Sequence, residues 1–286
     1  MPCMLEILDL RTLMINGLLI YFLFGVGLIL YSINHPQFKG ISTLGTGFLI
    51  ICVGTLLIGL RGYAPEFFSI ILANLFLVIG VILAHRSIAA FRGLSINRSK
   101  YVELSAVISI IAGLLYFTYI QTNVNARIII SSAILGALCL LIAQKALSKK
   151  ALQPSYFSSN FLGVSYLAFA FFFAIRLILT LDDSPLDNFM DAGSIHIMAI
   201  LVIQAIVLCT TFSVIWMATN FLEADLLEQA TRDPLTDVYN RRALDEIVSL
   251  EYSRSSRNKF PLSVVMTDID SFKKLNDRFG HQQGDK

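Results

Sequence analysis

Seven long apolar segments constrain the fold of this chain more than any other feature. A helix rises about 1.5 Å per residue and the hydrocarbon core of a bilayer is about 30 Å thick, so a spanning helix needs about 20 mostly apolar residues. Segments of this kind lie at residues 12–33, 44–62, 67–85, 102–120, 127–147, 161–181 and 194–219. We therefore expect an all-α polytopic membrane domain of about seven transmembrane helices in a lipid bilayer.

The charged residues are concentrated at the C-terminal end. Only 15% of the 286 residues are charged, whereas a soluble domain carries roughly a quarter. Residues 221–286 hold 22 of the 42 charged residues, which predicts a soluble part after the last apolar segment. The expected organisation is a sensor region at 1–219, a helical signalling linker at 220–232 and a further domain at 233–286. The net charge of +2 gives no reason to expect a nucleic-acid partner.

The loops between the apolar segments predict the orientation in the membrane. Lys and Arg are retained in cytoplasmic loops. One set of loops holds eight such residues: Lys39, Arg86, Arg92, Arg98, Lys100, Lys145, Lys149 and Lys150. The loops on the opposite side hold three: Arg11, Arg61 and Arg127. This bias and the odd number of segments both place the N-terminus outside and the C-terminal domain in the cytoplasm.

The linker has a weak pattern for pairing with a second copy. Leu222, Leu226 and Gln229 follow one another at spacings of four and three, as in the seam of a coiled coil. A homodimer through this exit helix is one interpretation, and a merely amphipathic exit helix is the other. Asp233-Pro234 then interrupts the helix, because proline disfavours helical geometry in the residue before it.

The soluble part predicts a helix, a strand and a second helix. Asn240 is a good N-cap for a helix with an apolar stripe at Ala243, Leu244, Ile247 and Leu250. The apolar run at 262–267 predicts a buried strand. Asp268 follows it at the carboxyl end, where open α/β sheets bind ligands.

The Asp268-Ile269-Asp270 sequence allows two interpretations. Asp270 or Ser271 could cap the helix that follows. Alternatively, the carboxylates could hold Mg²⁺, which prefers oxygen ligands and often shares substrate phosphates, with the helix N-terminus and Lys273 facing those phosphates.

The wider pattern RDPLTDVYNRRALDE, then DID, then SFKKLNDRFGHQQGD resembles the start of a GGDEF domain, the catalytic module of diguanylate cyclases. The resemblance covers residues 232–285, about a fifth of the chain. It implies an incomplete α/β, nucleotidyl-cyclase-like domain in a protein of the bacterial inner membrane. It also implies that two facing domains condense two GTP molecules to cyclic di-GMP and pyrophosphate, with Mg²⁺ as cofactor.

The resemblance also implies roles for individual residues. Asp268 matches the metal-binding aspartate and Ile269 the residue whose carbonyl assists it. Asn276 and Asp285 match residues that read the guanine edge. The remaining positions lie near the nucleotide or its phosphates: Phe272, Lys273 and His281. As a departure, Asp237-Val238 stands where the family usually has Gly-Leu, although Asp tolerates tight turns.

The Gly-Gly-(Asp/Glu)-Glu-Phe hairpin that names the family is not among these 286 residues. The catalytic residues that it would supply are therefore unknown, and we expect the 286 residues alone to be inactive and too small in their soluble part for a stable core. A complete protein with the hairpin would be a membrane sensor with a diguanylate cyclase output. The alternative is a non-catalytic seven-helix receptor or scaffold with a degenerate cyclase remnant.

Arg176 lies within the sixth apolar segment and has two interpretations. Ionisable residues inside a membrane usually mark functional sites, and Asn74 and His196 lie at a similar predicted depth, with Asp187 or Asp191 as possible partners of Arg176. These residues would form a pocket for an unknown sensory ligand. Arg176 is also close to the end of its segment, so its side chain could instead extend to the interface.

Overall fold

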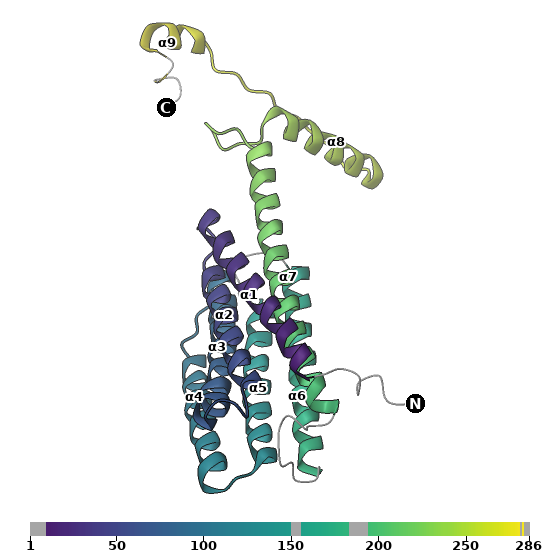
Figure 1. Cartoon of the computed structure of the whole chain (residues 1–286). Helices are drawn as coiled ribbons and strands as arrows, with labels where there is room; N and C mark the ends of the chain where they lie inside the picture. The colour runs from purple at the N-terminus through teal and green to yellow at the C-terminus, as the bar shows by residue number, and fades with distance from the viewer. Residues whose placement is uncertain (1–9, 150–155, 183–193, 281, 283–286) are drawn as a thin grey trace. The chain divides into compact units, whose positions relative to one another are not determined.

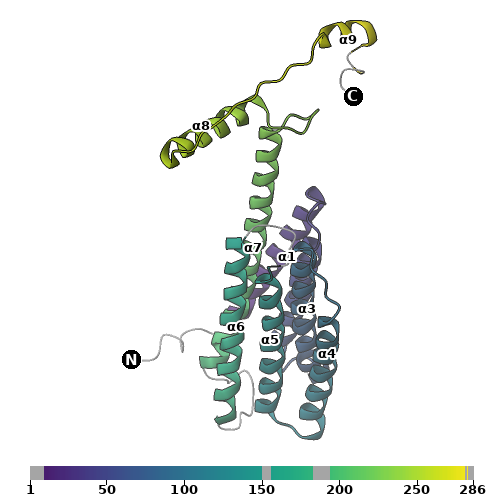
Figure 2. The same cartoon turned by 180° about the vertical axis from the view of Figure 1, so that it is seen from behind.

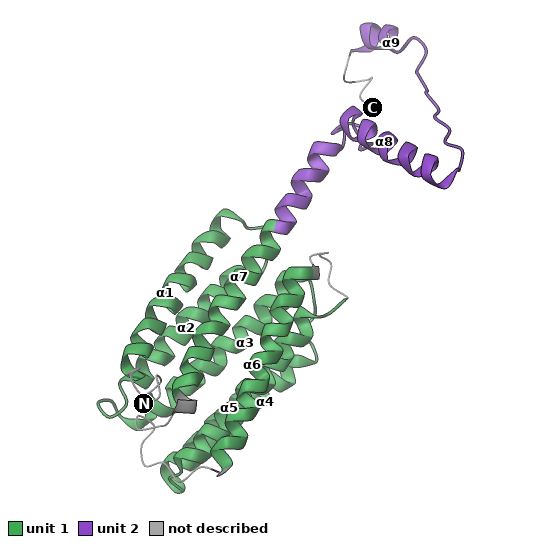
Figure 3. Ribbon diagram, turned by 90° about the vertical axis from the view of Figure 1, so that its right-hand side faces the viewer, with its two compact units in different colours: residues 1–219 green, residues 220–286 purple. Residues whose placement is uncertain are grey.

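The computed structural model describes residues 10–149, 156–182, 194–280 and 282, and the regular secondary structure of these residues is helical. The chain divides into two compact units, Met1–Thr219 and Asn220–Lys286 (Figure 3). The first unit is a bundle of long helices, and the second contains the end of the last long helix and two shorter ones.

Each of the seven predicted apolar segments corresponds to a helix long and apolar enough to cross a membrane (Figures 1 and 2). Two of these helices include a short π-helical stretch, η2 at the start of the third and η3 at the end of the fourth. The bounds are α1 Leu10–Asn34, α2 Ile41–Gly59, η2 Phe67–Leu72, α3 Ala73–Phe91, α4 Ser99–Leu115, η3 Tyr116–Ile120, α5 Val124–Ala146, α6 Tyr156–Asp182 and α7 Ser194–Thr231.

Glycines allow the first three helices to approach backbone to backbone. A Cβ built on Gly45 of α2 would lie 2.6 Å from the carbonyl oxygen of Gly25 in α1. On the other side of α2, a Cβ on Gly80 of α3 would lie 2.8 Å from the carbonyl oxygen of Gly47. Small residues at helix contacts are typical of membrane bundles, in which close van der Waals packing replaces the hydrophobic effect between helices.

Buried polar groups attach α7 to its neighbours. The side-chain amide of Gln204 donates to the carbonyl of Leu13 in α1 at 2.8 Å. Tyr166 of α6 shares a 2.8 Å hydrogen bond with the hydroxyl of Thr210, and both side chains are buried. The helix that leads to the second unit is therefore packed against both α1 and α6.

The loops with most of the cations meet at one end of the bundle. Arg92, which is 5% exposed, donates to carbonyls at the end of α5, including those of Lys145 at 3.0 Å and Ser148 at 2.9 Å. Lys145 in turn donates to the carbonyl of Ser95 at 2.6 Å. These cations satisfy carbonyls that the helix ends leave free, and the arrangement agrees with the charge separation expected from the sequence.

A buried ionic cluster of His85, Arg86 and Glu103 lies near the same end and was not foreseen from the sequence. Glu103 is 2% exposed and accepts from His85 Nδ1 at 2.7 Å. Its second carboxylate oxygen accepts from Arg86 Nε at 2.9 Å and Nη2 at 2.7 Å. The cluster joins α3 to α4, and its pairing offsets the cost of burying a carboxylate.

The second unit contains two helices after α7, α8 Arg241–Asn258 and α9 Phe272–Phe279. The strand expected at 262–267 is not formed: these residues have no regular secondary structure and form an extended connection between α8 and α9 (Figure 1). Val265 is 85% exposed and Met266 is 94% exposed. A strand requires a neighbouring strand for its backbone hydrogen bonds, and the described residues provide none.

We expect Gly45→Ala to destabilise the bundle by about 1–3 kcal/mol, since overpacking a tight contact has a cost of this size. The added methyl would lie 2.6 Å from the carbonyl oxygen of Gly25. Gly27→Ala is the matched control, because a Cβ there meets nothing within 4 Å. Thermal unfolding in nanodiscs measures both, and equal stability of the two variants would contradict the close approach of α1 and α2.

We expect Glu103→Ala to cost roughly 3 kcal/mol, because it leaves His85 and Arg86 without their buried carboxylate. The control is Glu223→Ala, at an exposed position on α7. Thermal unfolding in the same kind of nanodiscs should show a larger loss of stability for Glu103→Ala than for Glu223→Ala. A loss no larger than that of the control would show that the cluster contributes little to the bundle.

Candidate functional site

A tight turn connects α7 to α8 and is organised by Asp233. Its carboxylate accepts from the backbone of Leu235 and Thr236, both at 3.0 Å, and from the Thr236 hydroxyl at 3.1 Å. These hydrogen bonds favour the ionised form and lower the pKa of Asp233. Asp237 has φ 57°, in the left-handed region that favours glycine. Asp237 stands where the family that the sequence resembles usually has Gly, and at this φ a Gly would be less strained than Asp.

The predicted cap of α8 is confirmed. Asn240 Oδ1 accepts from the backbone of Ala243 at 3.0 Å, and its Nδ2 donates to the carbonyl of Ala230 at 2.8 Å. One side chain therefore begins α8 and holds it to the end of α7. The RDPLTDVYN sequence thus encodes a locally complete hydrogen-bonded connection.

The candidate metal residues lie on the exposed segment before α9. Asp268 Oδ1 accepts from the backbone of Ile269 at 2.9 Å, and both residues are exposed. Ser271 is the N-cap of α9, has φ 63° and makes no side-chain capping hydrogen bond. The capping role that one interpretation assigns to Ser271 is therefore not seen in the structure.

The oxygens at this position are of the type that Mg²⁺ prefers, but they are few. Asp268 offers a carboxylate, and the carbonyl of Ile269 accepts from the backbone of Phe272 at 3.3 Å. Within the described part of the chain, no three His, Cys, Asp or Glu residues gather as a metal site. This donor set fits a Mg²⁺ ion held largely by water and substrate phosphates, and it would not form a closed protein cage.

Helix α9 positions three of the candidate nucleotide residues. Phe272 and Asn276 are four residues apart and share one face of the helix, and Lys273 is exposed beside them. Asn276 Oδ1 is buried and has no hydrogen-bond partner among the described residues. The other two candidates, His281 and Asp285, lie outside the described residues.

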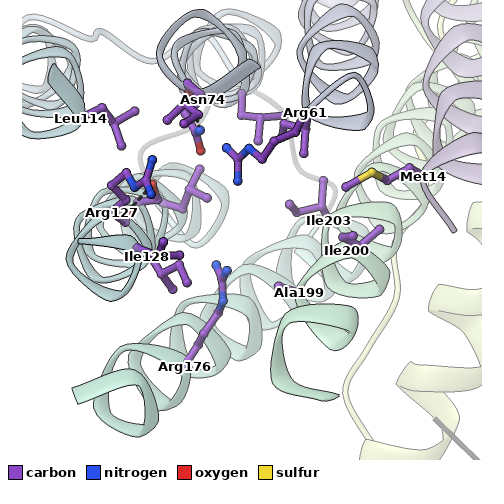
Figure 4. Close-up of a pocket in the computed structure, with 16 residues that line it drawn as sticks. Met14, Arg61, Asn74, Leu114, Arg127, Ile128, Arg176, Ala199, Ile200 and Ile203 are labelled. Carbon is purple, nitrogen blue, oxygen red and sulfur yellow. Dashed lines mark hydrogen bonds between the residues drawn. The ribbon is translucent and has the colours of Figure 1, made fainter. Parts of the chain in front are cut away.

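The first unit contains a pocket, and each of the seven long helices contributes to its lining (Figure 4). Arg176 and Asn74, which the sequence analysis placed at one depth, both line it. Arg61 and Arg127 also line it and were not foreseen, although the sequence analysis assigned both to the same side of the membrane. Asp187, Asp191 and the side chain of His196 lie outside the described residues.

Arg176 extends into the bundle and not towards its surface. It is 6% exposed, and its Nη1 donates to the hydroxyl of Ser132 in α5 at 3.3 Å. Figure 4 shows its guanidinium group pointing into the pocket. Of the two interpretations of Arg176, the structure therefore supports the pocket and not the extension to the interface.

Comparison with known proteins concerns mainly the second unit. Residues 230–286 match the family described as diguanylate cyclase, GGDEF domain. The probable diguanylate cyclase DgcT of Escherichia coli (strain K12) is 29% identical over 124 residues, which are 43% of this chain and 25% of that protein. This alignment is longer than the family match and so includes residues before it. No solved structure matches the chain.

Two further relatives are similar over shorter stretches. A diguanylate cyclase of Vibrio cholerae serotype O1 is 42% identical over 65 residues, 23% of this chain and 20% of that protein. Diguanylate cyclase DgcP of Pseudomonas aeruginosa is 45% identical over 62 residues, 22% of this chain and 9% of that protein. The chain thus spans a quarter or less of the length of these relatives. Residues 230–286, with the Asp233 turn, the Asn240 cap and the Asp268 segment, belong to the GGDEF family of diguanylate cyclases.

Proposed function

We propose that this chain is part of a membrane sensor whose GGDEF domain condenses two GTP molecules to cyclic di-GMP with release of pyrophosphate. The match of residues 230–286 to the GGDEF family is the observation that carries the proposal. The seven long apolar helices that precede the match support a multi-pass protein. The charge bias of its loops favours an external N-terminus and a cytoplasmic GGDEF domain.

In this proposal α9 and its flanks bind GTP. The side-chain amide of Asn276 both donates to and accepts from the guanine edge, and Asp285 accepts from the guanine N–H groups. An amide and a carboxylate together select a base that presents both donors and acceptors. Phe272 and Lys273 approach the phosphates, where Lys273 contributes a positive charge, and His281 contacts the nucleotide.

Asp268 and the carbonyl of Ile269 are the groups that would hold Mg²⁺. A bound divalent cation stabilises the charge that develops on the attacking and leaving oxygens during phosphoryl transfer. The role of Asp268 is to supply a negatively charged oxygen at the edge of the nucleotide site. Its exposure in the structure leaves that oxygen accessible.

The signal would pass along α7, which is one helix from Ser194 to Thr231. Each domain holds one GTP, so the reaction requires two domains face to face, and their relative placement controls the rate. Leu226 on this helix is 63% exposed, and such an apolar side chain is suited to contact a second copy. We therefore propose a homodimer through the exit helix, with the sensor region controlling its geometry.

We expect these 286 residues to form no cyclic di-GMP from GTP and Mg²⁺, because the Gly-Gly-(Asp/Glu)-Glu-Phe hairpin is not among them. The chain extended through its gene to include such a hairpin should form it. Chromatography and mass spectrometry of the nucleotides measure both proteins in nanodiscs. An extended chain with an intact hairpin and no product would contradict the proposed activity and favour a non-catalytic receptor.

In the extended chain we expect Asp268→Asn to lower the rate by about 100-fold or more, because the neutral amide is a poor ligand for a hard divalent cation. Asp277→Asn is the matched control, since this exposed carboxylate on α9 has no proposed role. Initial rates at several Mg²⁺ concentrations measure the effect. Equal rates for the two variants would remove Asp268 from the metal site.

A further inference from the structure

Among the described residues of the first unit, the pocket of Figure 4 has a neighbouring cavity on either side. It has a volume of about 80 Å³, several times the roughly 10–15 Å³ that one water needs. A wider cavity of about 560 Å³ shares Arg61, Ile70, Val124 and Arg127 with it. A third of about 20 Å³ shares Leu77, Leu135 and Ile203. These shared wall residues place the three cavities side by side in a row, called here the path, with the largest at one end and the smallest at the other.

Positive charge is concentrated where the wide cavity meets the middle one. The guanidinium groups of Arg61, Arg127 and Arg176 and the amide of Asn74 point toward one central space (Figure 4). Among the described residues that line the cavities, Glu66 is the acid, and it is exposed on the wide cavity. Among the described residues at this position, three arginines and one glutamate line the cavities, an excess of positive side chains.

Arg61 keeps its charge, and hydrogen bonds hold Arg61 and Asn74 in position. Burial and then the neighbouring Arg127 lower the pKa of Arg61 to about 10, while Glu66 raises it, so Arg61 is still protonated at neutral pH. Arg61 Nη2 donates to the carbonyl of Ser69 at 3.2 Å. Asn74 Nδ2 donates to the carbonyl of Ile70 at 2.7 Å, which fixes the Asn74 side chain. A preorganised guanidinium group binds carboxylate or phosphate through paired hydrogen bonds.

Beyond the arginines the path becomes apolar. The inner cavity is lined by aliphatic and aromatic side chains with Cys139: Ile51, Leu77, Val81, Leu135, Cys139, Tyr166, Phe173, Ile203, Ile206 and Val207. The hydroxyl of Tyr166 is engaged with Thr210, so its ring presents an apolar surface. A ligand along this path would meet charge at one end and hydrocarbon at the other.

We propose that this path is a binding site for a small organic anion, with its carboxylate or phosphate group at Arg61, Arg127 and Arg176 and a short apolar group directed toward Phe173. Two sources supply this chemistry, a free organic acid or phosphate ester and the headgroup of an anionic lipid. The π-helical stretch η2 contributes Ile70 to the site, and such stretches are frequent at functional sites.

The site is positioned to affect α7. Ala199, Ile200 and Ile203 of this helix line the middle cavity, and Ile203, Ile206 and Val207 line the inner one. The same helix continues to Thr231, and the GGDEF match begins at residue 230, within its last turn. Regulation of a cyclase by this anion rests on the proposed function. Binding of the anion does not, so a binding test without GTP separates anion binding from cyclase activity.

The test uses the 286-residue protein in phosphatidylcholine nanodiscs and titrates hexanoate and hexyl phosphate by calorimetry. We expect saturable binding of at least one of them. Hexanol has the same chain without the charge, and its affinity should be lower by about tenfold or more. Arg61→Gln, Arg127→Gln and Arg176→Gln should each weaken binding about tenfold or more. Arg98→Gln is the matched control, since Arg98 is exposed and does not line the cavities.

No saturable binding of either anion, equal binding of hexanol, or wild-type affinity in the three Gln variants would each overturn the proposal. If the Arg176→Gln variant fails to fold, the Arg61→Gln and Arg127→Gln variants, whose substitutions lie close to helix ends, still decide the result. Nanodiscs that contain phosphatidylglycerol separate the sources. A weaker apparent affinity there identifies the lipid headgroup as the occupant, and an unchanged affinity identifies a free anion.

Discussion

The structure of the first unit depends on one constraint, that backbone N–H and C=O groups in a bilayer must find their hydrogen bonds within the protein. Helices satisfy it segment by segment, and seven apolar segments therefore give seven helices. Once formed, the helices gain little from hiding apolar side chains, because lipid is equally apolar. Their association uses other contacts, namely the backbone approach at Gly25 and Gly45 and polar pairs such as Tyr166 with Thr210.

The same constraint gives meaning to the ionisable groups inside the bundle, since each has a high cost there. The Glu103 carboxylate is enclosed by His85 and Arg86, and its oxygens are occupied by their hydrogen bonds. At the opposite end, Arg61 and Arg176 line a cavity. The first arrangement stabilises the contact between α3 and α4. The second places guanidinium groups along the wall of a cavity.

The second unit shows which structure a short sequence can form from local interactions alone. The Asp233 turn and the Asn240 cap are complete because their partners lie within ten residues along the chain. A β-sheet joins segments that are distant in sequence, and the apolar residues at 262–267 have no such partner among the described residues. Val265 is accordingly 85% exposed, and the described residues leave this apolar segment uncovered.

The sequence by itself determined the number of helices, their approximate bounds, the cap of α8 and the family of residues 230–286. These depend on segment length, on local hydrogen bonding and on a motif, all of which can be read along the chain. It could not determine which side of each helix faces the interior, because lipid-facing and core-facing residues are equally apolar and leave no clear period. Only the tertiary structure showed that Arg61, Arg127 and Arg176 line one pocket and that Glu103 is paired. Such convergence depends on the rotation of each helix about its axis, which is set by contacts between helices distant in the sequence.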